Sequence, residues 1–152
     1  MKRGIWMAAA VGLAAAGLAA CGETSQPAEA APEGPAGISV SDARLMLPAV
    51  TGNPGALYFV VQNDGEKNRM IRAVEVAGAG SAVMHSSSMD ELPQVAVPAG
   101  ESASFAPGEQ HVMAMDLAET VAAGSTAEVT LTFVGGDKLS FPAEVRAAGD
   151  DR

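Results

Sequence analysis

Both histidines of this 152-residue chain lie next to methionines or one residue from them, within residues 84–115. Four of the eight methionines fall in the same stretch, which opens with Met84-His85-Ser86-Ser87-Ser88-Met89 and closes with His111-Val112-Met113-Ala114-Met115. Imidazole nitrogen and thioether sulfur are neutral donors, and the soft first-row ion that accepts this mixture is Cu(I). The pattern therefore indicates a soft-metal site. The alternative is that the methionines fill a core and the histidines have no role.

Strand geometry can bring these residues together. On a strand, alternate residues share a face, which places His111, Met113, Met115 and Leu117 on one side. Two such neighbours lie about 6–7 Å apart between Cα atoms, so both side chains can converge on one ion. We expect His85 and His111 at strand ends on the rim of the fold, with Leu117 as the core residue of the shared face. We interpret three further methionines as core residues: Met46, Met70 and Met84.

The N-terminus has the features of a secretory leader. Lys2 and Arg3 precede an apolar, alanine-rich run, and Leu18-Ala19-Ala20-Cys21 resembles the lipobox of bacterial lipoproteins, in which the cysteine is acylated. We therefore predict a signal peptide over residues 1–20 and a lipid on Cys21. The lipid would anchor the protein to a membrane of the cell envelope, facing the periplasm. An ordinary signal peptide followed by a free thiol is the alternative.

Composition excludes several classes of function. Cys21 is the only cysteine, so a lipidated chain has no thiol for a disulfide, a nucleophile or a thiolate metal site. The formal net charge of −9 argues against nucleic acid as a partner. We find no pair of carboxylates and no His-Ser-Asp grouping at positions that indicate a catalytic site, so we do not expect an enzyme.

The chain reads as one domain with short extensions. Residues 21–36 and 147–152 carry no large apolar side chain, which predicts a lipidated, disordered linker and a disordered tail around a domain over 37–146. Within the domain, short apolar runs end at proline, glycine or Asn-Asp signals. They cover residues 38–47, 56–61, 70–76, 81–85, 95–97, 102–105, 111–117, 127–134 and 138–145. This pattern of apolar runs and turn residues predicts an all-β sandwich or small Greek-key barrel of about eight to nine strands, with a hairpin at Gly135-Gly136-Asp137.

A family resemblance joins these observations. The PCuAC copper chaperones, which serve cytochrome c oxidase assembly, follow the pattern His, ten residues, Met, twenty-one residues, His, one residue, Met. Here Met89, twenty-one residues, His111, Val112, Met113 matches the second part. From Ile38 to Arg146 the chain resembles this family. Similar runs are Ala56-Leu57-Tyr58-Phe59, Asn63-Asp64-Gly65, Val97-Pro98-Ala99-Gly100, Phe105-Ala106-Pro107-Gly108 and the stretch from His111 to Leu117.

The chain departs from the family in one place. Only Ser86 to Ser88 separate His85 from Met89, where the family has ten residues. Either Met89 is the motif methionine brought close by the shortening, or it corresponds to an earlier loop methionine and that ligand is lost. The unbroken spacing to His111 favours the first alignment.

The resemblance implies a cupredoxin-like, immunoglobulin-like Greek-key sandwich that binds Cu(I) through His85, Met89, His111 and Met113. We add Met115, beside them on the strand, as a reserve ligand. The resemblance further implies delivery of Cu(I) to an acceptor, either subunit II of cytochrome c oxidase or a thiol-bearing copper assembly factor. The blue-copper electron carriers require a cysteine thiolate, which this domain lacks. Two alternatives stay open: a copper buffer or resistance lipoprotein with the same site, and a structural lipoprotein without metal.

Overall fold

The computed structural model describes residues 34–150. The predicted signal peptide, the lipidation site at Cys21 and most of the predicted linker lie outside the described residues. Within residues 34–150 no helix has the length and apolar character needed to cross a membrane.

Nine strands form where the apolar runs of the sequence predict them. Each run ends at a turn-forming residue, such as Pro98 and Gly100 after the fifth or Gly135 and Gly136 after the eighth. The strands are β1 (Ile38–Met46), β2 (Gly55–Asn63), β3 (Arg69–Val76), β4 (Ser81–His85), β5 (Val95–Val97), β6 (Ser102–Phe105), β7 (His111–Met115), β8 (Thr126–Phe133) and β9 (Lys138–Arg146). The prediction of an all-β fold with eight to nine strands is confirmed.

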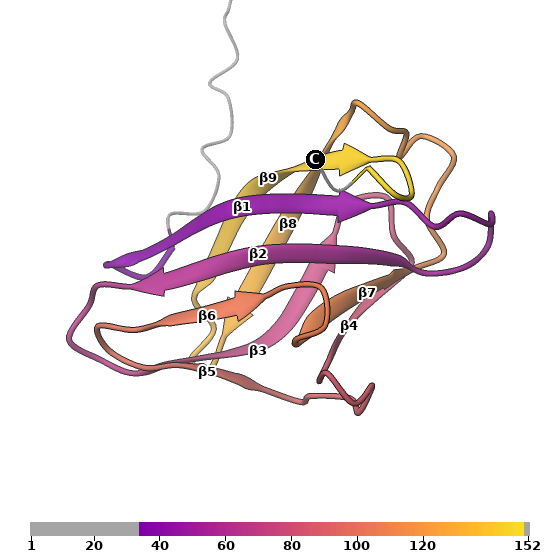
Figure 1. Cartoon of the computed structure of the whole chain (residues 1–152). Coiled ribbons are helices and arrows are strands. Elements are labelled where there is room, and N and C mark those ends of the chain that lie inside the picture. Colours follow the sequence, from indigo (N-terminus) through magenta and orange to yellow (C-terminus); the bar gives the residue numbers. More distant parts are fainter. Residues whose placement is uncertain (1–33, 151–152) are drawn as a thin grey trace, which may run out of the picture.

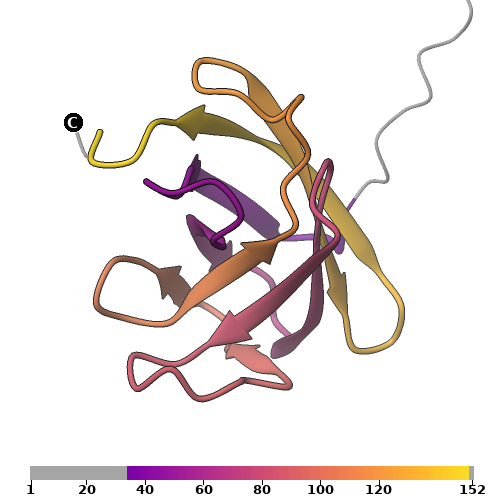
Figure 2. The ribbon, with the colours of Figure 1, turned by 90° about the vertical axis from the view of Figure 1, so that its right-hand side faces the viewer.

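The strands join into one continuous sheet that curls on itself. Its order is β4-β7-β2-β1-β9-β8-β3-β5, and β6 pairs with β2 beside β7. The β1–β9 pair is parallel and the others are antiparallel. In Figure 1 the strands β1, β2 and β6 cross in front of β3, β8 and β9, and Figure 2 shows the strands wrapped around a common interior.

Strand β2 illustrates how the sequence produces the core. Its residues alternate between buried and half-buried, so that Leu57, Phe59 and Val61 point inward. The rings of Phe59 and Phe105 stack inside the curl, with centroids 4.4 Å apart. All the buried apolar side chains of the main cluster belong to residues 45–145, so this part of the chain contains its own hydrophobic core.

One fully buried polar side chain stabilises the end of β2 through hydrogen bonds. Asn63 donates two hydrogen bonds from Nδ2, to the carbonyl oxygens of Lys67 (2.9 Å) and Val97 (2.8 Å). Its Oδ1 accepts a third from the backbone N–H of Gly65 at 3.1 Å. The amide therefore ties β2, the β2–β3 turn and β5 together, which accounts for a polar group with no exposed surface.

Two expectations about the core need correction. Met46 and Met84 are buried as predicted, but Met70 is only partly buried. The face of β7 that enters the core is that of Val112 and Ala114, not the face leading to Leu117. Strand β7 ends at Met115 because Asp116 adopts a left-handed backbone with φ of 52°. This breaks the alternation, and Leu117 packs against the edge of the core instead.

Candidate metal centre

The register of β4 against β7 brings the two histidines face to face. His85, the last residue of β4, is the direct partner of His111, the first residue of β7. The two imidazole rings are stacked, with centroids 6.1 Å apart and planes inclined by 23°. Residues that are 26 positions apart in the chain thus form one cross-strand pair at the end of the sheet.

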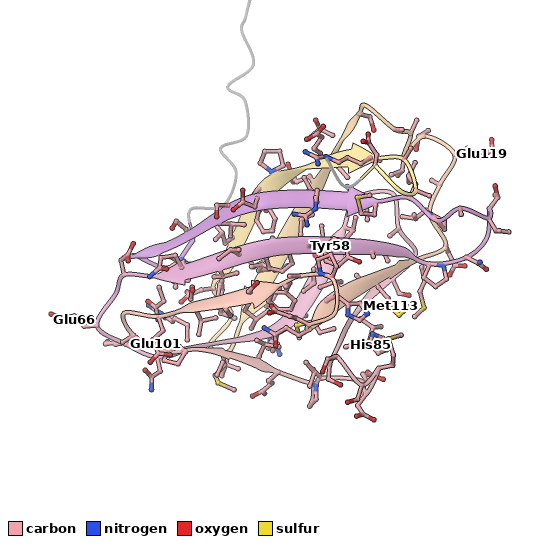
Figure 3. All side chains as sticks on the ribbon, viewed as in Figure 1. Tyr58, Glu66, His85, Glu101, Met113 and Glu119 are labelled. Atoms are coloured by element: carbon pink, nitrogen blue, oxygen red, sulfur yellow. The ribbon has the colours of Figure 1, made fainter. Side chains whose placement is uncertain are left out.

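Met113 shares the face of this pair. Strand β7 alternates between half-buried and buried residues, so His111, Met113 and Met115 point away from the core. Met113 lies opposite Val83 of β4 and beside Ala56 of β2. Figure 3 shows Met113 and His85 near one another on this part of the sheet. The prediction that strand geometry groups His111 with Met113 is confirmed, and the register adds His85 to them.

A tight hairpin carries Met89. The backbone N–H of Met89 donates to the carbonyl of Ser86 at 3.0 Å, and the N–H of Ser86 donates to the carbonyl of Asp90 at 2.8 Å. His85 forms a β-bridge with Glu91. The shortened segment is therefore a complete three-residue hairpin loop, further held by the Ser86 hydroxyl oxygen, which accepts the N–H of Ser88 and of Asp90, both at 3.2 Å.

Met89 occupies the strained position of that loop. Its φ is 67°, a left-handed conformation that glycine or asparagine usually takes. Its side chain is 55% exposed, so core packing does not explain the methionine. The hairpin places Met89 four residues after His85, but the strand pairing that unites the histidines and Met113 does not include it.

Backbone contacts orient both imidazoles in the same way. Nδ1 of His85 lies 3.3 Å from the carbonyl oxygen of Val83, and Nδ1 of His111 lies 3.0 Å from that of Glu109. A carbonyl oxygen only accepts, so each Nδ1 carries the proton and donates it. In the neutral imidazole this tautomer leaves the lone pair on Nε2, which is the atom available to a metal ion.

The ring separation suits a shared ion. A bond between a metal ion and an imidazole nitrogen is about 2 Å long, so two nitrogens on one ion lie within about 4 Å of each other. The ring centroids lie 6.1 Å apart, which leaves room for one ion between the two side chains. Both histidines are half-buried, which leaves the ion accessible from solvent.

The surrounding groups favour a soft ion. Among residues 34–150, no three histidine, cysteine or acidic side chains come together in a way that could hold a metal. The nearest soft donor on the face of the two imidazoles is the thioether of Met113, two residues after His111 on β7. Thioethers favour soft ions such as Cu(I) over the hard cations.

The strand pairing places Met115 further from the histidines and identifies two contacts of the imidazoles that the sequence did not predict. Met115 lies on the same face as Met113 but pairs with Ser81, one step further from the histidines. Two partners of the site were not predicted: Val83 and Glu109, whose carbonyls receive the Nδ1 protons. No sequence signal identifies them, because any residue type supplies a backbone carbonyl.

Comparison with known proteins adds a family. The family model described as "Putative lipoprotein LpqE-like" matches residues 38–145, which span all nine strands except the last residue of β9. No curated protein matches the chain.

Several solved structures share the fold. A copper-bound PCuAC domain from PmoF2 is 24% identical over 73% of this chain and 93% of its own, with a TM-score of 0.65. An apo PCuAC domain from PmoF1 is 26% identical over 73% of this chain and 94% of its own, with a TM-score of 0.66. The Cu(I) form of DR1885 from Deinococcus radiodurans is 20% identical over 79% and 85%, with a TM-score of 0.64. The expected cupredoxin-like fold of PCuAC domains is thereby confirmed.

Proposed function

This chain belongs to the LpqE-like family, and from that premise we propose that it is a copper chaperone of the cell envelope. It would bind one Cu(I) ion through His85, His111 and Met113, with Met89 as the fourth ligand and Met115 in reserve. The observation that carries the proposal is the direct pairing of His85 with His111, with the thioether of Met113 on the same face.

The ligand set suits delivery better than storage of the ion. Two neutral imidazoles and two thioethers leave the positive charge of Cu(I) uncompensated. The half-buried position leaves one side of the ion open to an incoming ligand. A thiolate of an acceptor brings the missing negative charge, so stepwise exchange from thioether to thiolate is favourable. The family resemblance makes the copper centre of cytochrome c oxidase, or a thiol-bearing factor that assembles it, the proposed acceptor.

The position of the site in the fold supports an anchored carrier. Ile38, at the start of β1, pairs with Asn63 at one end of β2, whereas Met113 pairs with Ala56 near the other end. Seven residues of strand separate them, or about 23 Å. A lipid on Cys21, upstream of β1, would therefore tether the domain at the end opposite the metal site.

Titration of the domain with Cu(I) under reducing conditions tests the site. We expect a one-to-one complex, which His111→Ala abolishes and His85→Ala weakens strongly. Met70→Leu is the matched control, because Met70 is a partly buried methionine of β3 outside the site, and it should bind like the unchanged chain. Absence of binding at stoichiometric copper would refute the proposal.

A deletion strain separates a chaperone from a copper buffer. Loss of a chaperone should impair oxidase assembly even when copper is moderately available. Loss of a buffer should leave oxidase assembly intact when copper is ample and should increase sensitivity to excess copper.

A further inference from the structure

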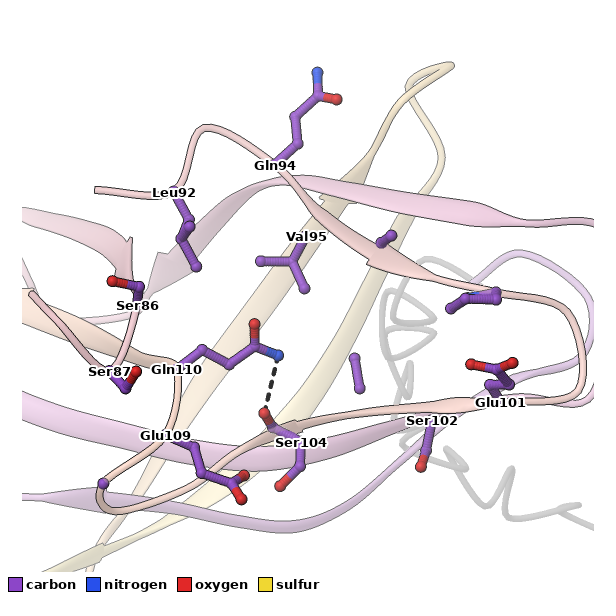
Figure 4. A pocket seen from close by; sticks show the side chains of 14 residues that line it. Ser86, Ser87, Leu92, Gln94, Val95, Glu101, Ser102, Ser104, Glu109 and Gln110 are labelled. Atoms are coloured by element: carbon purple, nitrogen blue, oxygen red, sulfur yellow. Dashed lines mark hydrogen bonds between the residues drawn. The ribbon is translucent and has the colours of Figure 1, made fainter. Parts of the chain in front are cut away.

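A groove of about 710 Å³ runs between β5 and β6 and ends at Ser86 and Gln110, the chain neighbours of the two histidines. Figure 4 shows Leu92 and Val95 on one side, Ser102 and Ser104 on the other, and Ser86 with Gln110 at one end. Ser86 directly follows His85, and Gln110 directly precedes His111. None of the proposed copper ligands lines the groove, so the copper site does not account for it.

The groove occupies the place of a missing strand. Strands β6 and β7 pair with successive parts of β2, and β4 pairs with β7 alone. After His85 the chain turns out of the line of β4 into the tight hairpin, because Ser86 already bonds to Asp90. The edge of β6 that an extended β4 would cover is left without a strand partner among the described residues.

That edge presents backbone groups that are not paired with β2. The N–H of Asn63 donates to the carbonyl of Glu101, so alternate residues of this antiparallel pair turn their backbone groups toward β2. The residues between them, Ser102 and Ser104, then turn theirs toward the groove. The side chain of Gln110 confirms this orientation, since its Nε2 donates to the carbonyl of Ser104 at 2.9 Å.

The acidic residues that line the groove favour a positively charged ligand. The charged residues that line it are Glu101 and Glu109, and the lining contains no lysine, arginine or histidine. The chain as a whole carries a formal net charge of −9. The linker upstream of β1 contains three glutamates and no basic residue between Gly22 and Ala36, so it is the wrong charge to fill the groove itself.

We propose that the groove receives an extended segment of a partner protein that carries lysine or arginine and pairs with the free edge of β6 as an added strand. Backbone pairing would supply affinity, and the two glutamates would supply selectivity for basic side chains. In antiparallel pairing the segment continues the line of β4, so its N-terminal end lies beside His85 and His111. The inference rests on the proposed function only in taking the partner to be a copper donor or acceptor.

The test uses residues 34–150, which contain the whole hydrophobic core described above, and a synthetic peptide that alternates lysine and threonine. We expect the peptide to shift the amide resonances of Ser102 to Phe105 in the metal-free domain. A second peptide, N-methylated at alternate residues, keeps the charge but cannot pair with a strand edge. It should bind about tenfold more weakly, as the loss of one or two hydrogen bonds requires.

Protein variants provide the complementary measurement. Ser104→Pro removes a backbone N–H that faces the groove and not β2, and it should weaken the peptide by about tenfold. Glu101→Gln with Glu109→Gln should also weaken it, whereas Glu128→Gln, on the exposed face of β8, should not. Equal binding of both peptides, or no binding at all, would overturn the groove proposal. Because Cu(I) titration of Ser104→Pro is a separate readout, a failed groove and a failed copper site are distinguishable.

Discussion

Replacing Met89 by glycine should stabilise the protein and weaken its binding of Cu(I). Met89 has φ of 67° at a loop position that favours glycine. A residue with a Cβ in this conformation costs roughly 1–2 kcal/mol. Glycine removes that cost but adds roughly 0.4–1 kcal/mol of unfolded-chain entropy, so a net gain of about 0.5–1 kcal/mol is expected. Little packing is lost, because the side chain is 55% exposed.

Thermal unfolding of the metal-free domain, followed by circular dichroism, measures the first effect. For a domain of this size 1 kcal/mol corresponds to about 4 °C, so the Met89→Gly midpoint should rise by about 2–4 °C. Competition with a chromogenic Cu(I) chelator measures the second effect. The expected loss of affinity follows from the loss of one thioether ligand.

Met89→Ala is the matched control. It removes the same thioether but keeps a Cβ in the left-handed conformation, so it should lose copper affinity without gaining stability. If Met89→Gly is no more stable than Met89→Ala, the strain argument is wrong. If both variants hold Cu(I) as tightly as the unchanged chain, Met89 is not a ligand.

Three other changes probe the fold and the site. Asn63→Ala should cost about 3 kcal/mol in urea unfolding, because it removes one buried and two partly buried hydrogen bonds and leaves their backbone partners unsatisfied. Met113→Leu should weaken Cu(I) binding in the chelator assay and leave the unfolding midpoint unchanged. Met70→Leu should change neither the affinity nor the midpoint. If the two variants bind Cu(I) equally well, Met113 is not a ligand. Gly37→Ala should lower the unfolding midpoint, since Gly37 has φ of 81° and a Cβ there would lie 2.7 Å from the backbone nitrogen of Gly65. The strain of the left-handed conformation alone is about 1–2 kcal/mol, and an unchanged midpoint would contradict it.

The strands could be predicted because the sequence marks both their interiors and their ends. Apolar runs of strand length define β2 and β8, and glycines with positive φ close the β8–β9 hairpin at Gly135 and Gly136. The end of β7 could not be predicted in the same way. Asp116 is a residue type that tolerates the left-handed conformation but does not require it, so the alternation through Leu117 remained equally plausible from sequence.

The hairpin that carries Met89 shows a second limit. A run of three serines indicates a turn, but the sequence does not reveal that Ser86 closes a three-residue loop with Met89 in its strained position. That geometry depends on the bridge between His85 and Glu91 and on the bond from the N–H of Leu92 to the carbonyl of Met84. Both are pairings between two segments and have no local signature.

The sequence by itself determined the all-β class, the donor types at the candidate site and the absence of any thiolate ligand in the domain, because each follows from residue identity and short-range periodicity. Only the tertiary structure decided that His85 faces His111, that backbone carbonyls contact both Nδ1 atoms, and that one edge of β6 has no strand partner among the described residues. The pairing of the two histidines depends on the register of β4 against β7, and a shift of one residue would have turned one of them to the other face.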